Sequence, residues 1–233
     1  MSGASALIVL QARIGSARLP GKVLAPIAGQ PMLGHCIRRL QASRMGPVIV
    51  ATTSGRADDS VADVAWEFGA GIVRGADADV LTRYVQAVAE WEGAFVIRAT
   101  ADNPAVDPES CERLVRRLEE GADYAVEDGL PVGATVEAVR TEVLRAVSAE
   151  VTSAEEREHV TLGIRSRPTA WRVVVSPAPD ALRRPDLRLT VDTADDLARM
   201  RRLLTCADAG RRIVPLADLI WLADRFEPES EVA

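Results

Sequence analysis

The segment that decides the fold reads ALIVLQARIGSARLPGK and runs from Ala6 to Lys22. Its first six residues, Ala6–Gln11, form an apolar run bounded by a loop with glycine and proline, which is typical of a strand buried on both faces. A helix is expected next, beginning near Pro31, because apolar residues then recur at helical spacing. A buried strand, a loop and a covering helix form the first unit of an α/β protein.

Strand and helix patterns continue to alternate as far as residue 121. The expected strands are Val48–Ala51, Gly71–Val73 and Phe95–Ala99. The expected helices span Ser60–Phe68, run from Asp79 to about Trp91, and run from Asp107-Pro108 to Gly121. This alternation predicts an α/β fold in which helices cover both faces of a mainly parallel sheet.

The pattern is less regular in the second half of the chain. Further strands are expected at Val136–Val139, Trp171–Val175 and Leu187–Val191, with a loop at Gly129–Gly133. Capping-box signatures predict one helix from Ser153 to before Pro168 and another beginning after Thr193, and an amphipathic helix spans Pro215–Phe226. Because there is no internal repeat or low-complexity linker, residues 1–233 are predicted to form a single domain.

Composition excludes several classes of protein. The chain has 34 acidic and 28 basic residues, and its net charge of −6 argues against binding to nucleic acid or to an anionic membrane. No apolar run approaches the roughly 20 residues needed to span a bilayer. Cys36, Cys111 and Cys206 are far apart and only two histidines are present, which disfavours a disulfide framework or a zinc site. We therefore expect a cytoplasmic protein without a membrane or nucleic-acid partner.

The loop after the first strand has the composition of a triphosphate site. Three basic side chains supply positive charge, two glycines let the backbone come close to a ligand, and a serine adds a hydroxyl donor. These residues are Arg13, Arg18 and Lys22, Gly15 and Gly21, and Ser16. Neither the Walker pattern nor the dinucleotide pattern G-x-G-x-x-G is present. On its charges alone, the segment could equally be a basic surface loop.

The full string is more specific than its charges. Q-A-R-x-G-S-x-R-L-P-G-K-V-L, beginning at Gln11 and followed by I-x-G-x-P-M-L, resembles the signature loop of the cytidylyltransferases. These include the enzymes that make CMP-activated keto-deoxy sugar acids and the branch of the spore-coat polysaccharide biosynthesis protein F, to which the resemblance is greater. It implies a Rossmann-like, GT-A-like nucleotidyltransferase fold, a three-layer sandwich around a mainly parallel central sheet.

The resemblance also implies roles for single residues. The loop would hold the β- and γ-phosphates of CTP, and Lys22 would neutralise charge on the leaving pyrophosphate, which is electrostatic stabilisation of the transition state. The expected catalytic residues are Lys22, Arg13 and Asp102. The expected nucleotide-binding residues are Gln11, Ala12, Arg13, Gly15, Ser16, Arg18, Lys22, Thr52, Thr53, Arg74, Gly75 and Ala101.

A second segment, Arg74–Tyr84, is similar to the family's R-G-x-x-x-D-V-L-x-R-Y and lies near the nucleoside in that family. Its backbone, with Thr52 and Thr53, is expected to contact the cytosine edge. Asp79 is expected to cap a helix. Asp77-Ala78-Asp79 also matches the D-x-D pattern of many glycosyltransferases, a three-residue match that is common by chance.

Two aspartates follow expected strands. Asp102 resembles the metal-binding aspartate of the family's T-G-D-x-P segment, with Ala101 in place of the glycine, and Asp192 lies in a segment similar to L-T-V-D-T-x-x-D-L. Magnesium prefers one or two carboxylates together with waters and phosphate oxygens. Asp102 and Asp192 are therefore expected to hold Mg²⁺ as the cofactor; the alternative for Asp102 is a structural role in a turn.

The acceptor side is the least constrained part of the sequence. Leu130–Glu137 resembles the family's L-P-x-G-x-D-x-E, except that Thr135 replaces the aspartate, and Arg157–Thr161 matches R-E-H-V-T of the branch. The expected acceptor-binding residues are Glu137, His159 and Arg157, although a lone histidine on a helix is more often structural. Residues 129–175 are expected to contribute to acceptor binding and dimerisation, and the resemblance implies a homodimer.

These observations favour magnesium-dependent transfer of CMP from CTP to a small sugar-like, sugar-acid or phosphonate acceptor, with release of pyrophosphate. CTP and the acceptor are the expected partners. Two alternatives stay open: a GT-A-type glycosyltransferase that consumes a nucleotide sugar, and a non-catalytic nucleotide-binding relative. No general base is obvious, and the preference for cytosine rests on the resemblance.

Overall fold

A computed structural model describes residues 5–226 of the chain, and all structural statements concern these residues. The strands are β1 (Ala6–Gln11), β2 (Pro26–Ile27), β3 (Gln30–Pro31), β4 (Val48–Thr53), β5 (Gly71–Gly75), β6 (Phe95–Thr100), β7 (Tyr124–Asp128), β8 (Glu137–Arg140) and β9 (Val173–Pro177). The α-helices are α1 (Met32–Ala42), α2 (Asp59–Glu67), α3 (Val80–Ala87), α4 (Pro108–Glu119), α5 (Thr141–Glu150), α6 (Ala154–Glu158), α7 (Leu162–Arg165), α8 (Ala194–Cys206) and α9 (Leu216–Phe226). Three short 3-10 helices are η1 (Lys22–Leu24), η2 (Arg56–Asp58) and η3 (Asp180–Leu182).

The central sheet has the strand order β5-β4-β1-β6-β8-β7-β9, and β2 pairs with β3 in a separate hairpin. Strands β5, β4, β1 and β6 run parallel, whereas β8 lies antiparallel between β6 and β7. The predicted α/β fold with a mainly parallel sheet is thereby confirmed.

Strand β1 lies where the direction of the chain through the sheet reverses. From β1 the chain passes to β4 and β5 on one side, and it then returns to β6 on the other side of β1. Ligands of open α/β sheets bind at the carboxyl ends of the strands beside such a switch point. The topology therefore places a binding crevice between the loops that follow β1 and β6.

Burial of β1 on both faces explains its apolar sequence. Ala6, Ile8 and Leu10 pack into the core beneath α1 and α4, whereas Leu7 and Val9 pack beneath α3 and α5. These five side chains are at most 2% exposed. Each larger one stabilises the fold by about 1.5–3 kcal/mol through burial. The predicted strand Ala6–Gln11 is confirmed to the residue.

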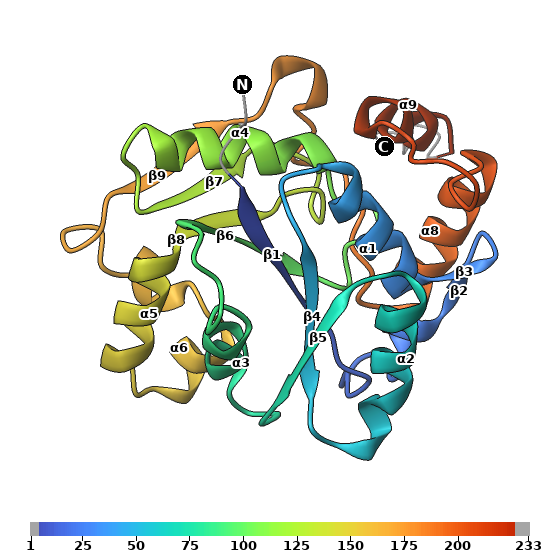
Figure 1. Ribbon diagram of the computed structural model, residues 1–233. Coiled ribbons are helices and arrows are strands. Elements are labelled where there is room, and N and C mark those ends of the chain that lie inside the picture. Colours follow the sequence, from blue (N-terminus) through green and yellow to red (C-terminus); the bar gives the residue numbers. More distant parts are fainter. Residues whose placement is uncertain (1–4, 227–233) are drawn as a thin grey trace.

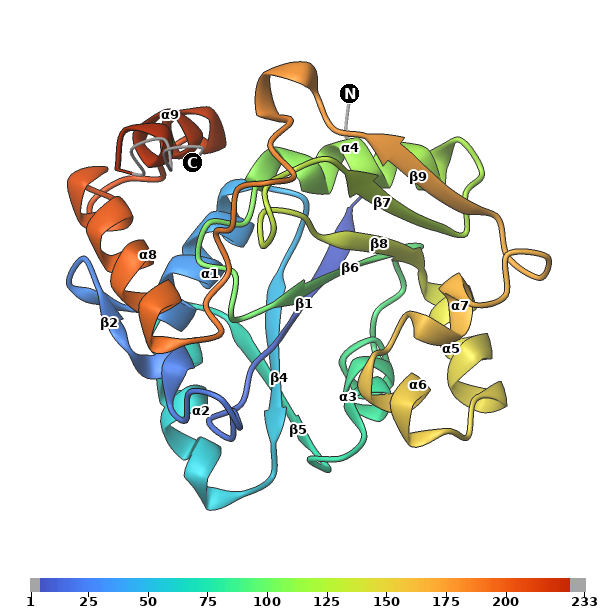
Figure 2. The same ribbon diagram turned by 180° about the vertical axis from the view of Figure 1, so that it is seen from behind.

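Helices cover both faces of the sheet (Figure 1). Buried residues of α1, α2, α4, α8 and α9 form one core, and those of α3, α5 and α7 form the other. Seen from behind, α3, α5, α6 and α7 lie together on their side of the sheet, away from α1, α8 and α9 (Figure 2). The result is three layers, with the sheet in the middle.

Several helix ends follow the predicted capping chemistry. The Asp79 carboxylate accepts a hydrogen bond from the Thr82 N–H at 2.9 Å and so begins α3. Asp107 caps α4 ahead of Pro108, and the capping box predicted at Thr193 is present at the start of α8. Helix α3 ends at Ala87 and is therefore shorter than expected. Just beyond its end, the Val88 carbonyl accepts a hydrogen bond from the Arg145 side chain.

Two predictions in the second half of the chain are wrong. Residues Leu187–Val191 are not a strand of the sheet, because their backbone instead bonds to the 130–134 loop around Val132. The single helix expected between Ser153 and Pro168 is divided into α6 and α7, because Val160 has a φ of 47°. Strand β7 and helix α5 were not expected; α5 follows β8 directly, without a loop that would mark its start.

Among residues 5–226, no helix has both the length and the apolar character needed to cross a membrane.

Candidate active site

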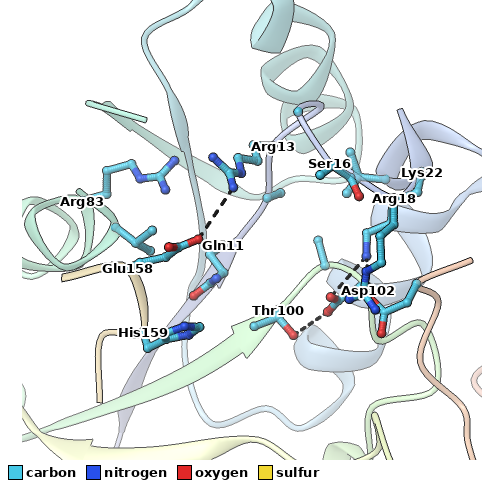
Figure 3. Close-up of a pocket in the computed structure, with 17 residues that line it drawn as sticks. Gln11, Arg13, Ser16, Arg18, Lys22, Arg83, Thr100, Asp102, Glu158 and His159 are labelled. Carbon is cyan, nitrogen blue, oxygen red and sulfur yellow. Dashed lines mark hydrogen bonds and ion pairs between the residues drawn. The ribbon is translucent and has the colours of Figure 1, made fainter. Parts of the chain in front are cut away.

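A cavity of about 390 Å³ opens at the carboxyl ends of β1 and β6. Gln11 and Thr100, the last residues of these strands, are paired in register, so the loops that follow them start next to each other. Figure 3 shows Arg18, Lys22 and Asp102 together in one part of the cavity, with Arg83 and His159 in another. Eight of the predicted nucleotide-binding residues line this cavity: Gln11, Ala12, Arg13, Gly15, Ser16, Arg18, Lys22 and Ala101.

The phosphate loop, residues 12–22, is folded back on itself around Ile14. The Ile14 carbonyl accepts hydrogen bonds from the Ser16 and Gly21 N–H groups, and the Ile14 N–H donates to the Asp58 carboxylate at 2.7 Å. Gly21 has a φ of 74°, in the left-handed region that favours glycine. These bonds turn the chain so that Lys22, at the start of η1, faces the cavity.

Lys22 lies between the two aspartates predicted to hold a metal. Its Nζ is 3.4 Å from Oδ2 of Asp102 and 3.3 Å from Oδ1 of Asp192, and it donates to the Val191 carbonyl at 2.7 Å. The Lys22 side chain is 10% exposed, so water screens these contacts only weakly. Three groups separated by 80 and 170 positions in the chain therefore meet at one wall of the cavity.

The sheet and a neighbouring loop hold the two aspartates together. Asp102 follows β6, and its Oδ1 accepts a hydrogen bond from the Thr100 hydroxyl at 2.6 Å. The Val191 N–H donates to the Asp102 carbonyl at 2.9 Å, which ties the segment of Asp192 to the end of β6. Asp192 is thus placed by backbone pairing with a loop and not, as predicted, by the end of a strand.

Asp192 is surrounded by positive charge. Its Oδ1 accepts from Arg18 at 2.8 Å, and its Oδ2 from Arg188 at 2.5 Å. Arg18 is exposed, so its side chain is available to a ligand that enters the cavity. Arg188 also bonds, at 3.2 Å, to Asp196, the partner of Thr193 in the capping box of α8. Burial alone would raise the pKa of Asp196, but hydrogen bonds from the N–H groups of Asp192 and Thr193 outweigh it and lower that pKa to about 2.

The other end of the cavity contains Arg13, Arg83, Glu158 and His159. Arg13 forms an ion pair with Asp77 at 2.6 Å and approaches Glu158 at 3.9 Å. Arg83, in contrast, is 2% exposed, and its Nε and Nη1 atoms make no hydrogen bond within residues 5–226. Burial lowers the pKa of its guanidinium. An arginine side chain facing a cavity without a carboxylate partner is unusual, because burying an unpaired charge is costly.

A second cavity, of about 300 Å³, lies beside the first at the ends of β4 and β5. Two of the predicted nucleotide-binding residues, Thr53 and Gly75, line it, and Arg13 and Gly15 line both cavities. Thr52 and Arg74 line neither of them. The Arg74 side chain donates to the Thr53 and Gly55 carbonyls and pairs with Asp59, so it braces the loop after β4.

Of the three predicted acceptor-binding residues, only His159 lines the main cavity. Glu137 pairs with Arg98 at 3.1 Å and accepts a hydrogen bond from the Thr161 hydroxyl at 2.6 Å. Arg157 bonds to the Asp79 carboxylate at 2.8 Å and to the Val151 carbonyl, and so ties α6 to the start of α3. Both side chains support the segment that carries His159, and neither reaches the cavity.

Sequence reasoning assigned no role to several residues that line the cavity, among them Thr100, Arg83 and Glu158. Arg83 lies inside the quoted motif of residues 74–84, but a motif shows neither the burial of this side chain nor the absence, among residues 5–226, of a hydrogen-bond partner for Nε and Nη1. One feature of the sequence does point to the site: Lys22 is the only lysine in the chain, beside 27 arginines. A chain that uses arginine everywhere else has lysine where a compact ammonium contacts three oxygens.

The aspartates agree with a magnesium site in donor chemistry. Asp102 and Asp192 provide hard carboxylate oxygens, and the Asp102 side chain is 31% exposed at the cavity wall. Within residues 5–226 no group of three or more histidine, cysteine, aspartate or glutamate side chains could enclose a metal ion. Magnesium usually takes one or two carboxylates and completes its shell with water and phosphate oxygens.

Fold and cavity together define an α/β protein of the nucleotide-binding class. A family model described as cytidylyltransferase matches residues 7–214. The chain is also 33% identical over 226 residues to the spore coat polysaccharide biosynthesis protein SpsF of Bacillus subtilis (strain 168), with 94% of each chain covered. The chain belongs to the cytidylyltransferase family and is a CTP-dependent nucleotidyltransferase, as the signature loop predicted.

Solved structures agree on the fold. A cytidylyltransferase from Leptospira borgpetersenii serovar Hardjo-bovis (strain JB197) superposes with a TM-score of 0.85 at 23% identity, covering 95% of both chains. The structure of CMP:2-keto-3-deoxy-manno-octonic acid synthetase complexed with CTP gives a TM-score of 0.64 at 22% identity and covers 87% of this chain and 99% of that one. The predicted Rossmann-like nucleotidyltransferase architecture is confirmed.

Proposed function

We propose that the protein transfers CMP from CTP to a small sugar-like, sugar-acid or phosphonate acceptor and releases pyrophosphate, with magnesium as its cofactor. The observation that carries this proposal is the contact of Lys22 with both Asp102 and Asp192 beside the phosphate loop. Phosphate-binding cations and carboxylates able to bind a metal then share one cavity, which suits nucleotidyl transfer because the reaction depends on positioning and charge stabilisation.

In the proposed reaction, an acceptor oxygen attacks the α-phosphorus of CTP, the bond from that phosphorus to the bridging oxygen breaks, and pyrophosphate leaves with the electron pair. Lys22 and Arg18 stabilise the charge that develops on the pyrophosphate, and Arg13 binds the triphosphate from the opposite side of the loop. Lys22 acts as a point charge, held in place by the Val191 carbonyl. The Gly15 backbone N–H and the Ser16 hydroxyl, both of residues that line the cavity, add donors to the phosphates.

Asp102 and Asp192 would hold Mg²⁺, which supplies Lewis-acid polarisation of the phosphate oxygens when it is bound. Arg18 and Lys22, which contact these carboxylates, are then available to the β- and γ-phosphates. The complex of CMP:2-keto-3-deoxy-manno-octonic acid synthetase with CTP supports the choice of nucleotide.

We propose that the nucleoside occupies the second cavity, beside Thr53 and Gly75, and that the acceptor enters the main cavity at the end marked by His159. Two cavities that share Arg13 and Gly15 suit a substrate whose triphosphate passes from one to the other. The homodimer, with residues 129–175 contributing to acceptor binding and dimerisation, stays a prediction from the family resemblance.

The proposal is tested first with the unmodified protein. Thermal stability is measured with each nucleoside triphosphate and Mg²⁺, and pyrophosphate release is then measured with a panel of sugar, sugar-acid and phosphonate acceptors. CTP should give the largest stabilisation and should release pyrophosphate. A glycosyltransferase would instead release a nucleoside mono- or diphosphate from a nucleotide sugar, so absence of pyrophosphate across the whole panel would count against nucleotidyl transfer.

Two variants test the site. Asp102→Asn should lower kcat by about 100-fold or more while the melting temperature changes little, since one transition-state contact is worth that much. Lys22→Arg should also be impaired, because a planar guanidinium does not fit a point between three oxygens. Because Lys22 is the only lysine, an N-hydroxysuccinimide ester can label only Lys22 and the N-terminal amine, and CTP with Mg²⁺ should protect Lys22. Full activity of Asp102→Asn would remove that carboxylate from the mechanism.

A further inference from the structure

The Arg83 side chain stands out among the groups that the reaction scheme does not use. It comes from the middle of α3 and lies in the wall of the main cavity. Arg83 as a whole is 2% exposed, and its Nε and Nη1 atoms are buried without a hydrogen-bond partner within residues 5–226. Figure 3 shows the Arg83 and Arg13 side chains pointing toward one another, at the end of the cavity that also contains Glu158 and His159.

The surrounding structure accommodates this side chain without neutralising it. A Cβ added to Gly75 would lie 2.8 Å from Cγ of Arg83, so the glycine leaves room for the arginine stem. The nearby carboxylates are engaged elsewhere: Asp77 pairs with Arg13 at 2.6 Å, and Glu158 also faces Arg13, at 3.9 Å. The fold thus holds the Arg83 guanidinium in a buried position with two donor atoms, Nε and Nη1, unmatched by any group of residues 5–226, which is unfavourable unless an anion offsets the charge.

The position of Arg83 relative to the reacting groups indicates which anion that is. Lys22 and Arg18 mark where the pyrophosphate leaves, and an in-line displacement puts the attacking acceptor on the far side of the α-phosphorus. The nucleoside is assigned to the second cavity, which Arg83 does not line. The part of the main cavity that Arg83 and His159 line is therefore left for the acceptor.

We infer that Arg83 is a specificity-determining residue that binds an oxyanion group of the acceptor, either a carboxylate or a phosphate-type group, so that the enzyme selects anionic over neutral acceptors. This inference rests on the proposed function. A guanidinium donates charge-assisted hydrogen bonds to either oxyanion, and Arg83 has two donor atoms, Nε and Nη1, that no group within residues 5–226 satisfies. His159 lies at the same end of the cavity and can contact the rest of the acceptor.

The experiment compares three hexoses that differ only at carbon 6: glucuronate, glucose 6-phosphate and glucose. Calorimetric binding and thermal shifts are measured for the wild type, Arg83→Met, Arg83→Lys and the matched control Arg116→Gln, whose arginine is exposed on α4. The wild type and the control should bind at least one of the two anions and not glucose. Arg83→Met should bind that anion at least about tenfold more weakly, as expected for loss of a charge-assisted contact, and should melt at a higher temperature without ligand because an unpaired buried charge is gone.

Arg83→Lys keeps the charge but not the fork, so it should bind the anion more weakly than the wild type and carries the test if the methionine variant does not fold. The inference is overturned if glucose binds as well as the anions, if neither anion binds the wild type, or if Arg83→Met retains anion binding. Loss of CTP binding in Arg83→Met with anion binding intact would assign the residue to the nucleotide instead. Failure of the proposed function is separate, because it appears as absent CTP binding or pyrophosphate release in the wild type.

Discussion

Replacing Gly133 with alanine should both destabilise the protein and disable its site. Gly133 has a φ of 93°, a conformation that residues with a side chain rarely adopt. A Cβ at this position would lie 2.7 Å from the Thr190 backbone nitrogen, 2.8 Å from Thr190 Cβ and 2.9 Å from Oδ1 of Asn103. A backbone atom cannot move aside as a flexible side chain can, so the segment that carries Thr190 and Asp192 must shift away from Gly133.

The size of the effect follows from two contributions. The left-handed backbone costs about 1 kcal/mol for alanine, and the overlap with a packed backbone costs about 1–3 kcal/mol more. A total near 3 kcal/mol corresponds to a melting temperature about 6–12 °C lower for a chain of this size. Activity should fall as well, because the Val191 N–H bond to the Asp102 carbonyl, 2.9 Å long, cannot persist if Thr190 moves.

Gly29→Ala is the matched control. Gly29 has a φ of 81°, but no atom of residues 5–226 lies within 4 Å of an added Cβ, so only the backbone cost of about 1 kcal/mol applies. It lies in the β2–β3 hairpin and lines neither cavity. Differential scanning calorimetry and pyrophosphate release on both variants separate backbone strain from overlap. Equal melting temperatures for the two variants, or full activity of Gly133→Ala, would refute the idea that this glycine fixes the position of Asp192.

Two further predictions concern groups near the site. Tyr84→Phe should lower the free energy of unfolding, measured in urea, by about 1–2 kcal/mol. The reason is that the buried hydroxyl lies 3.2–3.3 Å from the Val9 and Ala99 carbonyls and from Oε1 of Gln11. An unchanged free energy of unfolding would show that these contacts contribute nothing. Asp196→Asn should lower the free energy of unfolding by about 2 kcal/mol at neutral pH, since one pKa unit is worth about 1.4 kcal/mol and the folded state lowers the pKa of Asp196 to about 2. A lowered pKa stabilises the folded state above about pH 4, the pKa of the unfolded state, and ceases to do so as the pH falls toward 2. The difference in free energy of unfolding between wild type and variant should therefore narrow from pH 5 to pH 2. A difference independent of pH would contradict the lowered pKa of Asp196.

The local features of this protein could be predicted because each depends on neighbouring residues. The apolar run Ala6–Gln11 needs burial on both faces, whatever covers it, and the capping side chains of Asp79, Asp107 and Thr193 act within three residues of their own position. The resemblance of the loop from Gln11 to Lys22 could be recognised for a related reason, since its donors and turns lie in one continuous stretch.

Other features depend on packing between distant segments. Leu187–Val191 has the alternation of a strand, but β9 rather than this segment takes the last position in the sheet, and the segment pairs with a loop instead. Glu137 stands in a motif linked to the acceptor, yet Arg98 lies opposite it in the β6–β8 register and holds it by an ion pair. The residue pattern of one segment does not show which other segment it will pack against.

The sequence by itself therefore determined the α/β alternation, the first strand with its phosphate loop and the family, because these depend on periodicity and on contiguous residues. Only the tertiary structure decided that Lys22 meets Asp102 and Asp192, that Glu137 and Arg157 form ion pairs outside the main cavity, and that Nε and Nη1 of Arg83 are buried without a hydrogen-bond partner among residues 5–226. The physical reason is that charge pairing and desolvation depend on distances across the fold, and strand order and loop packing set those distances.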